Sequence, residues 1–195
     1  MKKLFLLVAA LAIVFANVDV NAQCPPGYTS HVNDITYDGC TYKYYFCLGI
    51  NQFGLHEIVL SEIQISEPCT PDDFAQHASE ITDAILLDIA AEGYIYAEWG
   101  YEIPQCPDNF CSVRWRDRIC YSKVWIHDEI EKKYIMNRCP DGYDKDGRPV
   151  YEERSCGETV RICWEWENGV KVLRIWRGGF PQGKECPPGC IDNCD

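Results

Sequence analysis

Thirteen cysteines in a chain of 195 residues constrain the fold more than any other feature of the sequence. In an oxidising compartment thiols at this density pair as disulfides, whereas in the cytosol they more often bind metal. Because thirteen is odd, at least one cysteine is expected to stay free or to bond another chain. The disulfide candidates are Cys24, Cys40, Cys47, Cys69, Cys106, Cys111, Cys120, Cys139, Cys156, Cys163, Cys186, Cys190 and Cys194.

The start of the chain predicts export. Lys2 and Lys3 precede an apolar run from Leu4 to Ala16, and Val20-Asn21-Ala22 fits the cleavage rule of a secretory signal. The apolar run is shorter than the ~20 residues that cross a bilayer, and nothing after Ala22 resembles a transmembrane segment. We therefore expect residues 1–22 to be a signal peptide and the protein to be extracellular, at the cell surface or periplasmic.

A Cys-Pro motif recurs along the chain and predicts an imperfect internal repeat. The four copies are CPPGY at Cys24, CPDNF at Cys106, CPDGY at Cys139 and CPPGC at Cys186. In the first and third copies a C-x6-C pair follows, at Cys40/Cys47 and Cys156/Cys163; the middle copy, with Cys111 and Cys120, is compressed. We expect Cys24 to pair with Cys40 and Cys139 to pair with Cys156.

The segments between the cysteines have the two-residue period of half-buried strands. Apolar and polar residues alternate over residues 112–119 and 160–166. Asn168-Gly169 then predicts a two-residue hairpin turn in which Glu167 faces Val170 and Arg161 meets Trp176 as a cation–π pair. Further strands are expected at residues 55–65, 94–99, 122–126 and 133–137, with a turn over 127–131.

One segment, residues 71–92, breaks this pattern and predicts an amphipathic helix. Thr70 fits the N-cap and Pro71 the first helical position, and Gly93 is a stop signal. The buried face is expected to carry Phe74, Ala78, Ile81, Ile85 and Ile89.

The predicted fold class is therefore α+β, mainly antiparallel hairpins with one amphipathic helix, stabilised by disulfides. We expect an N-terminal β/helix unit over residues 23–103, a C-terminal β-hairpin unit over 104–185 and a cysteine-rich tail over 186–195.

Metal and cofactor sites have weak support in the sequence. Asp144, Asp146 and Glu153 match positions of a calcium-binding loop, but Gly142 stands at its first position and no amphipathic helices flank it. Cys186, Cys190 and Cys194 have no histidine nearby to complete a zinc site. We expect no cofactor and keep calcium as the alternative to a solvated turn.

The sequence gives little support to catalysis. None of the glycine-rich, nucleophile-elbow or zinc-protease motifs is present, and nothing selects a thiol close to one of the four histidines, His31, His56, His77 and His127. A secreted hydrolase that uses carboxylates we cannot locate is the weakest of our hypotheses.

Charge and aromatic content favour a protein partner instead. A net charge of −12 repels phosphate backbones and argues against nucleic acid. Arg114, Arg116 and Arg118 form a basic row that, with Trp176, is a candidate interaction surface, although the arginines also suit carboxylates across a sheet. We expect a structural, adhesive or assembly module that binds itself or another surface protein. The alternative is a carbohydrate- or small-ligand-binding domain that uses the six tryptophans and twelve tyrosines as stacking platforms.

Overall fold

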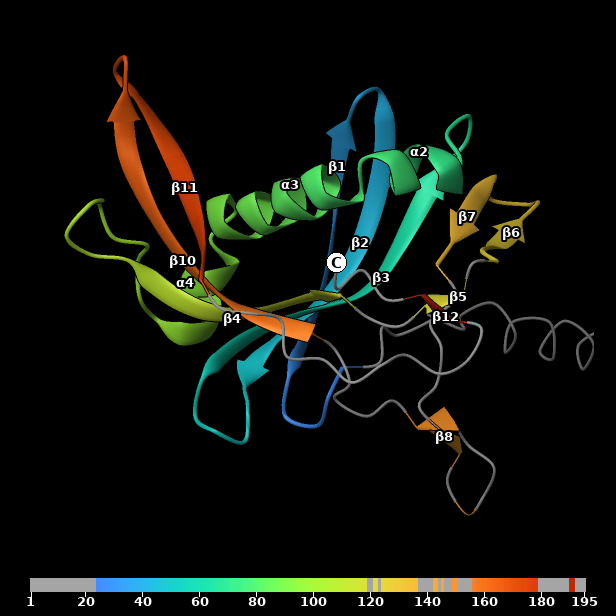
Figure 1. Ribbon diagram of the computed structural model, residues 1–195, viewed down its shortest axis with the longest axis horizontal. Helices are drawn as coiled ribbons and strands as arrows, with labels where there is room; N and C mark the ends of the chain where they lie inside the picture. The colour runs from blue at the N-terminus through green and yellow to red at the C-terminus, as the bar shows by residue number, and fades with distance from the viewer. Residues whose placement is uncertain are drawn as a thin grey trace, which may run out of the picture.

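The computed structural model describes residues 24–118, 121–122, 124–136, 142–143, 145, 149–150, 156–178 and 190–191. This part of the chain is rich in sheet and has three helices, with mainly antiparallel strands (Figure 1). The predicted signal peptide, most of the predicted tail and the side chains of Asp144, Asp146, Glu153 and Arg118 lie outside the described residues.

One sheet runs through both predicted halves of the chain. Its strands, in spatial order, are β1 (Thr29–Tyr37), β2 (Cys40–Ile50), β3 (His56–Ser66), β4 (Cys111–Arg118), β10 (Cys156–Glu167) and β11 (Val170–Gly178). Only the β3–β4 pair is parallel among these neighbours. The predicted boundary at residues 103–104 therefore falls inside one sheet.

Smaller pairs complete the strand list. β6 (Ile126–Asp128) and β7 (Lys133–Ile135) form a hairpin, and β7 pairs with the end of β3. β5 (Tyr121–Ser122) pairs with β12 (Cys190–Ile191), and β8 (Gly142–Tyr143) pairs with β9 (Pro149–Val150).

Two hairpins close on tight turns with positive φ. Asn168 and Gly169 have φ of 51° and 80°, and Asp38 and Gly39 have φ of 46° and 78°. This is the backbone that a two-residue type I′ turn requires. The register predicted for β10 and β11 is confirmed, with Glu167 opposite Val170.

The predicted helix over residues 71–92 is present as two helices, α2 (Pro71–Gln76) and α3 (Ala78–Ala91). They meet at His77, and the Asp73 carboxylate accepts the Thr70 backbone N–H at 2.7 Å in a capping box. The expected strand at residues 94–99 is wrong, because Tyr94–Trp99 forms the short helix α4. Gly93 and Gly100, with φ of 80° and 74°, bound it at both ends.

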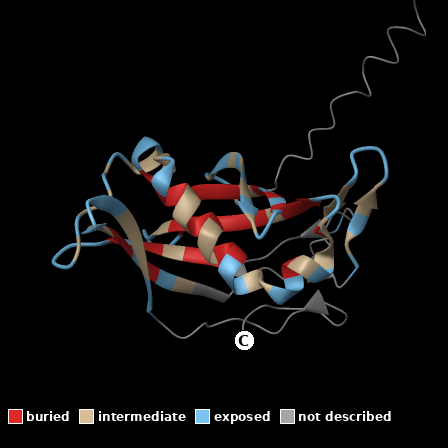
Figure 2. Ribbon diagram, turned by 90° about the horizontal axis from the view of Figure 1, so that it is seen from above, coloured by how far each residue is buried: buried red, intermediate tan, exposed pale blue. Residues whose placement is uncertain are grey.

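The core lies between the sheet and α3. The helix crosses one face of the sheet and buries Ile81, Ile85 and Ile89 against it, and the buried strands run beneath it in Figure 2. On the sheet side of the core, the buried side chains include Tyr42, Tyr44, Phe46, Ile58, Trp115 and Ile162. Phe74 on α2 is buried too, whereas Ala78 is partly exposed.

Each copy of the Cys-Pro motif, with the two cysteines that follow it, forms a cysteine triplet; one of the three observed disulfides closes within a triplet, and the other two leave it. Cys24 pairs with Cys47, and Cys40 pairs with Cys69, so the predicted Cys24–Cys40 bond is wrong. The third bond links Cys106 to Cys163, from different copies of the motif. The predicted Cys139–Cys156 bond lies outside the described residues. The internal repeat stays a prediction. The three observed bonds do not connect equivalent cysteines of its copies.

Among the described residues, no helix has both the length and the apolar character needed to cross a membrane.

Candidate functional site

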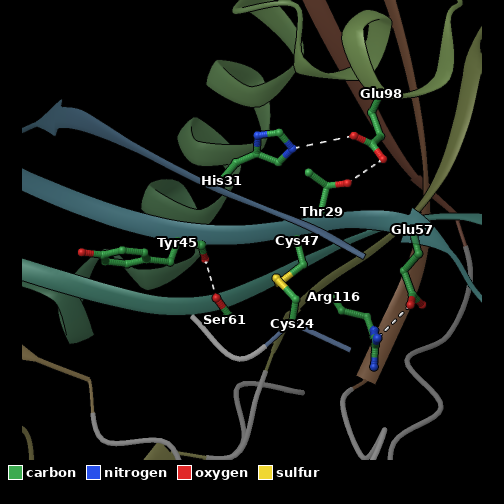
Figure 3. Close-up of a disulfide and its surroundings, with 9 residues drawn as sticks. All are labelled: Cys24, Thr29, His31, Tyr45, Cys47, Glu57, Ser61, Glu98 and Arg116. Carbon is green, nitrogen blue, oxygen red and sulfur yellow. Dashed lines mark hydrogen bonds and ion pairs between the residues drawn. A yellow bond between two sulfur atoms is a disulfide. The ribbon is translucent and has the colours of Figure 1, made fainter. Parts of the chain in front are cut away.

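The arginine row on β4 meets a buried carboxylate on β3. Glu57 is 2% exposed and receives Arg116 Nη2 at 2.7 Å and Arg114 Nε at 3.1 Å (Figure 3). The Tyr28 hydroxyl donates to the same carboxylate at 2.6 Å. Arg116 is itself 4% exposed. The hypothesis that these arginines neutralise a carboxylate across the sheet is thus supported for Arg114 and Arg116; Arg116 is buried, whereas the Arg114 side chain is 32% exposed.

Tyr28 is held over this cluster by a glycine. A Cβ atom on Gly49 would lie 2.5 Å from Cγ of Tyr28, so the ring packs directly on the backbone of β2. Only glycine leaves room for this approach. The disulfide Cys24–Cys47 fixes the same N-terminal segment to β2, as Figure 3 shows.

A free thiol lies inside the fold. Cys111 on β4 is a free cysteine and is 5% exposed. It donates to the Tyr101 hydroxyl at 3.5 Å, and that hydroxyl lies 3.0 Å from Nδ1 of His56. Burial raises the pKa of Cys111, so it stays a thiol at neutral pH. This thiol, although linked to His56 through the Tyr101 hydroxyl, is thus buried and protonated.

No metal site emerges among the residues that the structure describes. Cys40, Cys69 and Asp73 lie close enough to share an ion, but the two cysteines form a disulfide and Asp73 caps α2. The calcium candidates Asp144, Asp146 and Glu153 stay a prediction, since only the backbone pairing of β8 with β9 on either side of that loop is described.

The β10–β11 hairpin, called the arm below, extends beyond the end of α3 (Figure 1). It carries exposed aromatic side chains. Trp166 and Trp176 are 58% and 47% exposed, and Val170 at the turn is 62% exposed. Arg161 lies opposite Trp176 in the ladder, as predicted, and its guanidinium lies 4.4 Å from the ring centre of Phe110. The cation–π contact with Trp176 stays a prediction. Phe110 is the aromatic neighbour that the sequence pattern missed.

Each face of the arm has its own surroundings. On the face toward α3, the Lys171 ammonium lies 4.6 Å from the ring centre of Trp164, and Arg177 forms an ion pair with Asp83 of the helix. On the opposite face Arg174 forms ion pairs with Glu165 and Glu167. The charges of the arm are therefore largely compensated, while its aromatic rings stay exposed.

Two hollows adjoin the arm on the helix side. The first, of about 450 Å³, is lined by Ala90, Ala91, Gly93, Ile95, Tyr96, Tyr101, Glu102, Ile103, Lys171 and Leu173. The second, of about 650 Å³, is a groove over the outer face of α3 between β1 and β11. Its lining is Asp34, Ile35, Thr36, Ala84, Leu87, Asp88, Ala91, Lys171, Val172 and Leu173. Both hollows are of the size of small-ligand sites.

The groove contains a carboxylate that the sequence analysis did not single out. Asp88 on α3 accepts a hydrogen bond from Nδ2 of Asn33 at 2.8 Å and another from the Tyr44 hydroxyl. Burial, followed by this contact with Asp88, raises the pKa of Tyr44. These bonds tie α3 to β1 and β2 and hold the floor of the groove in place.

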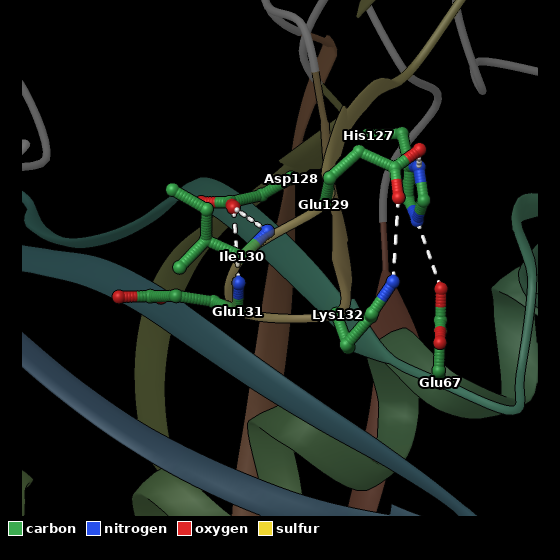
Figure 4. A network of polar contacts seen from close by, with 7 residues as sticks. All are labelled: Glu67, His127, Asp128, Glu129, Ile130, Glu131 and Lys132. Atoms are coloured by element: carbon green, nitrogen blue, oxygen red, sulfur yellow. Dashed lines mark hydrogen bonds and ion pairs between the residues drawn. The ribbon is translucent and has the colours of Figure 1, made fainter.

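A network of polar contacts around His127 lies where the β6–β7 hairpin pairs with the end of β3. His127 on β6 lies 2.9 Å from both Glu67 and Glu129, and Lys132 lies 3.3 Å from Glu129 (Figure 4). The imidazole stacks on Tyr134, with ring centres 4.5 Å apart. Its hydrogen bond to Glu67 is the largest cause that raises the pKa of His127. The network therefore favours the protonated imidazole.

A pH dependence follows from this network. Because the folded-state pKa of His127 is raised above the ordinary histidine value of 6.5, its stabilising effect is complete below that value and is lost as pH rises through the folded pKa. Replacing His127 by glutamine should lower the melting temperature more at about pH 5.5 than at about pH 8.5. In a Glu67→Gln background, the His127→Gln substitution should lower the melting temperature by nearly the same amount at the two pH values. Equal effects at both pH values would contradict the assignment.

Compared with protein-family models, with curated proteins and with solved structures, the chain has no significant match.

Proposed function

We propose that the protein is an exported, disulfide-stabilised, non-catalytic association module, and that its arm contacts a second copy of the chain. The observation that carries this proposal is the half exposure of Trp166 and Trp176 on a projecting hairpin. Trp166 lies on the face of the arm that carries Lys171, and Trp176 lies on the opposite face. Tryptophan and arginine dominate the binding energy of protein interfaces. Export is supported by three disulfides, which persist in oxidising compartments.

The absence of an activated nucleophile supports the non-catalytic part of the proposal for the described residues. Cys111 is a buried thiol with a raised pKa, and its hydrogen-bond partner Tyr101 has a pKa raised by burial as well. Neither group is suited to exchange protons or attack a substrate near neutral pH.

The test is self-association of the full chain, without the signal, by sedimentation velocity across a concentration series. The double substitution Trp166→Ser/Trp176→Ser should weaken dimer formation by about thirtyfold or more, since even a single interface hot spot contributes ~2 kcal/mol. The matched control is Phe53→Ser/Ile130→Ser, which removes two other apolar side chains that are 74% and 92% exposed. A wild-type protein that stays monomeric at every concentration, or equal losses in both variants, would refute the proposal.

Carbohydrate binding is the second candidate, and the first hollow favours it. Tyr96 is 58% exposed at its edge, and Glu102 and Lys171 supply an acceptor and a donor for sugar hydroxyls around an apolar floor. Titration of a glycan panel should then change tryptophan fluorescence, and a Tyr96→Ala variant should lose the change. A silent response across the panel would exclude this candidate.

A further inference from the structure

We infer that the turn between β2 and β3 is a membrane-contact tip, which inserts its apolar side chains among the headgroups of a zwitterionic lipid bilayer. This turn, residues 50–55 and called the tip below, lies at the end of β2 opposite the β1–β2 turn and projects from the sheet (Figure 1). Its three large apolar side chains, Ile50, Phe53 and Leu55, are 56%, 74% and 51% exposed. The tip is distinct from the exposed tryptophans of the arm.

The tip has no ionisable side chain. From Leu48 to Leu55 the chain reads Leu-Gly-Ile-Asn-Gln-Phe-Gly-Leu, and Gln52 is exposed whereas Asn51 is buried. The β6–β7 turn offers a contrast, because Ile130 is 92% exposed there but stands between Glu129 and Glu131. Two neighbouring carboxylates make the entry of Ile130 into a lipid phase unfavourable. Phe53 has no such neighbours in the chain.

The backbone of the tip forms its hydrogen bonds within the tip. Oδ1 of the buried Asn51 accepts the backbone N–H groups of Phe53 and Leu55 at 3.0 and 3.1 Å. The Gly54 N–H donates to the Asn51 carbonyl, and the Asn51 N–H donates to the Leu55 carbonyl, both at 2.9 Å. Backbone groups without partners are costly to move out of water into lipid. These four internal bonds therefore allow the tip to insert as it stands.

Aromatic rings lie at the base of the tip. His56 is opposite Ile50 in the β2–β3 ladder and stacks on Trp99, with ring centres 4.6 Å apart. The ring centre of Tyr101 lies 5.1 Å from that of His56. Tryptophan and tyrosine are enriched at the level of lipid headgroups. Glu102, next to Tyr101, is exposed, so insertion is expected to stop at this level.

The size of the tip favours a bilayer over a protein partner. A specific protein interface buries ~800 Å² on each side, from about 20 to 30 residues, and forms a hydrogen bond per ~100–200 Å². The tip supplies only the residues of one turn, and several of its donors are already bonded internally. A bilayer requires no hydrogen bonds from the tip, and burial of a few apolar side chains gives weak, reversible binding.

Charge determines which lipid the tip accepts. A net charge of −12 is repelled by anionic headgroups, whereas phosphatidylcholine carries no net charge. Glu57, which follows His56 on β3, is buried and paired with Arg114 and Arg116, so this carboxylate presents no exposed negative charge at the base. The tip therefore fits a zwitterionic bilayer better than an acidic one.

The experiment measures co-flotation of the full chain, without the signal, with small unilamellar vesicles of phosphatidylcholine. The bound fraction of the wild-type chain should rise with lipid concentration, and replacing part of the phosphatidylcholine by phosphatidylserine should lower it. Phe53→Ser should lower the partition coefficient by about tenfold or more, because the transfer of a phenylalanine side chain out of water is lost. The matched control Ile130→Ser also removes an exposed apolar side chain and should leave the coefficient unchanged.

A second pair of variants tests insertion without removing an apolar side chain. Gln52→Glu adds a charge to the tip and should weaken binding, whereas Gln52→Asn should not. No flotation of the wild-type chain, equal losses in Phe53→Ser and Ile130→Ser, or unchanged binding of Gln52→Glu would overturn the inference. Weaker self-association of Phe53→Ser in sedimentation velocity would assign the tip to a protein contact and also overturn it. The dimerisation test on Trp166 and Trp176 uses no lipid, so either proposal can fail without the other.

Discussion

Replacing Glu57 by glutamine is expected to lower the free energy of unfolding by about 3 to 5 kcal/mol, because it leaves two arginines beside a neutral group inside the protein. Arg116 and Glu57 are almost fully buried, so water does not replace the lost partner. The Tyr28 hydroxyl also exchanges a carboxylate acceptor for a weaker amide. Urea unfolding followed by tryptophan fluorescence measures the change, and the slope of the transition should stay constant.

The matched control for Glu57 is Glu165→Gln. This carboxylate also pairs with an arginine, Arg174, but both side chains are more than one third exposed. Exposed ion pairs contribute about 0 to 1 kcal/mol, so the unfolding midpoint should hardly move. Losses of similar size in the two variants would show that the Glu57 cluster is not a buried ion pair in solution.

Removing the Cys106–Cys163 disulfide, by Cys106→Ser/Cys163→Ser, is expected to lower the free energy of unfolding by about 4 kcal/mol. This bond closes a loop with a sequence separation of 57, and the chain entropy released in the unfolded state grows with loop length. It also anchors residues 104–106 beside β10, where Cys106 N–H donates to the Trp164 carbonyl at 2.9 Å. Thermal unfolding under non-reducing conditions measures the loss.

Cys111→Ala serves as the control for this double substitution. It removes a buried cysteine that bonds no other cysteine, and the cost should be about 1 kcal/mol. If the double variant unfolds at the wild-type midpoint, the pairing of Cys106 with Cys163 is wrong. If the Cys111 variant is as unstable as the double variant, lost packing rather than the cross-link explains the effect.

Local chemistry made the arm predictable. Asn168-Gly169 set the turn, and the period of two over residues 160–166 set which side chains share a face, so the whole register followed. The helical region was predictable for the same reason, since Thr70, Pro71 and the apolar spacing act within a few residues. The interruption at His77 was not, because the spacing of apolar residues continues across it.

Helix α4 shows how a local pattern misleads. Tyr94, Tyr96 and Trp99 have aromatic side chains typical of strands, and the pattern predicted one. The left-handed conformations of Gly93 and Gly100 confine these six residues to a single short helix, and Ile95 is the residue that it buries. Tertiary packing outweighed a propensity that is worth little per residue.

The candidate site depended on long-range contacts that no local pattern contains. Glu57 meets the arginines only because β3 pairs in parallel with β4, across more than fifty residues of chain. Disulfide connectivity has the same limit: spacing suggested that the triplets close within themselves, whereas two of the three observed bonds leave them. The groove between β1 and β11 likewise exists only once the sheet is complete.

The position of Cys111 has a consequence for the chemical durability of the folded protein. A free thiolate attacks disulfides and reshuffles them, so a protein that holds both a free cysteine and disulfides is open to that reaction. Cys111 stands opposite Ile162 in the β4–β10 ladder, so these two side chains lie on the same face of the sheet. The next residue, Cys163, points to the opposite face. Backbone separates the thiol from the nearest disulfide along the strand, and burial keeps it protonated. Among the described residues, the native fold thereby keeps the Cys111 thiol apart from the Cys106–Cys163 cross-link.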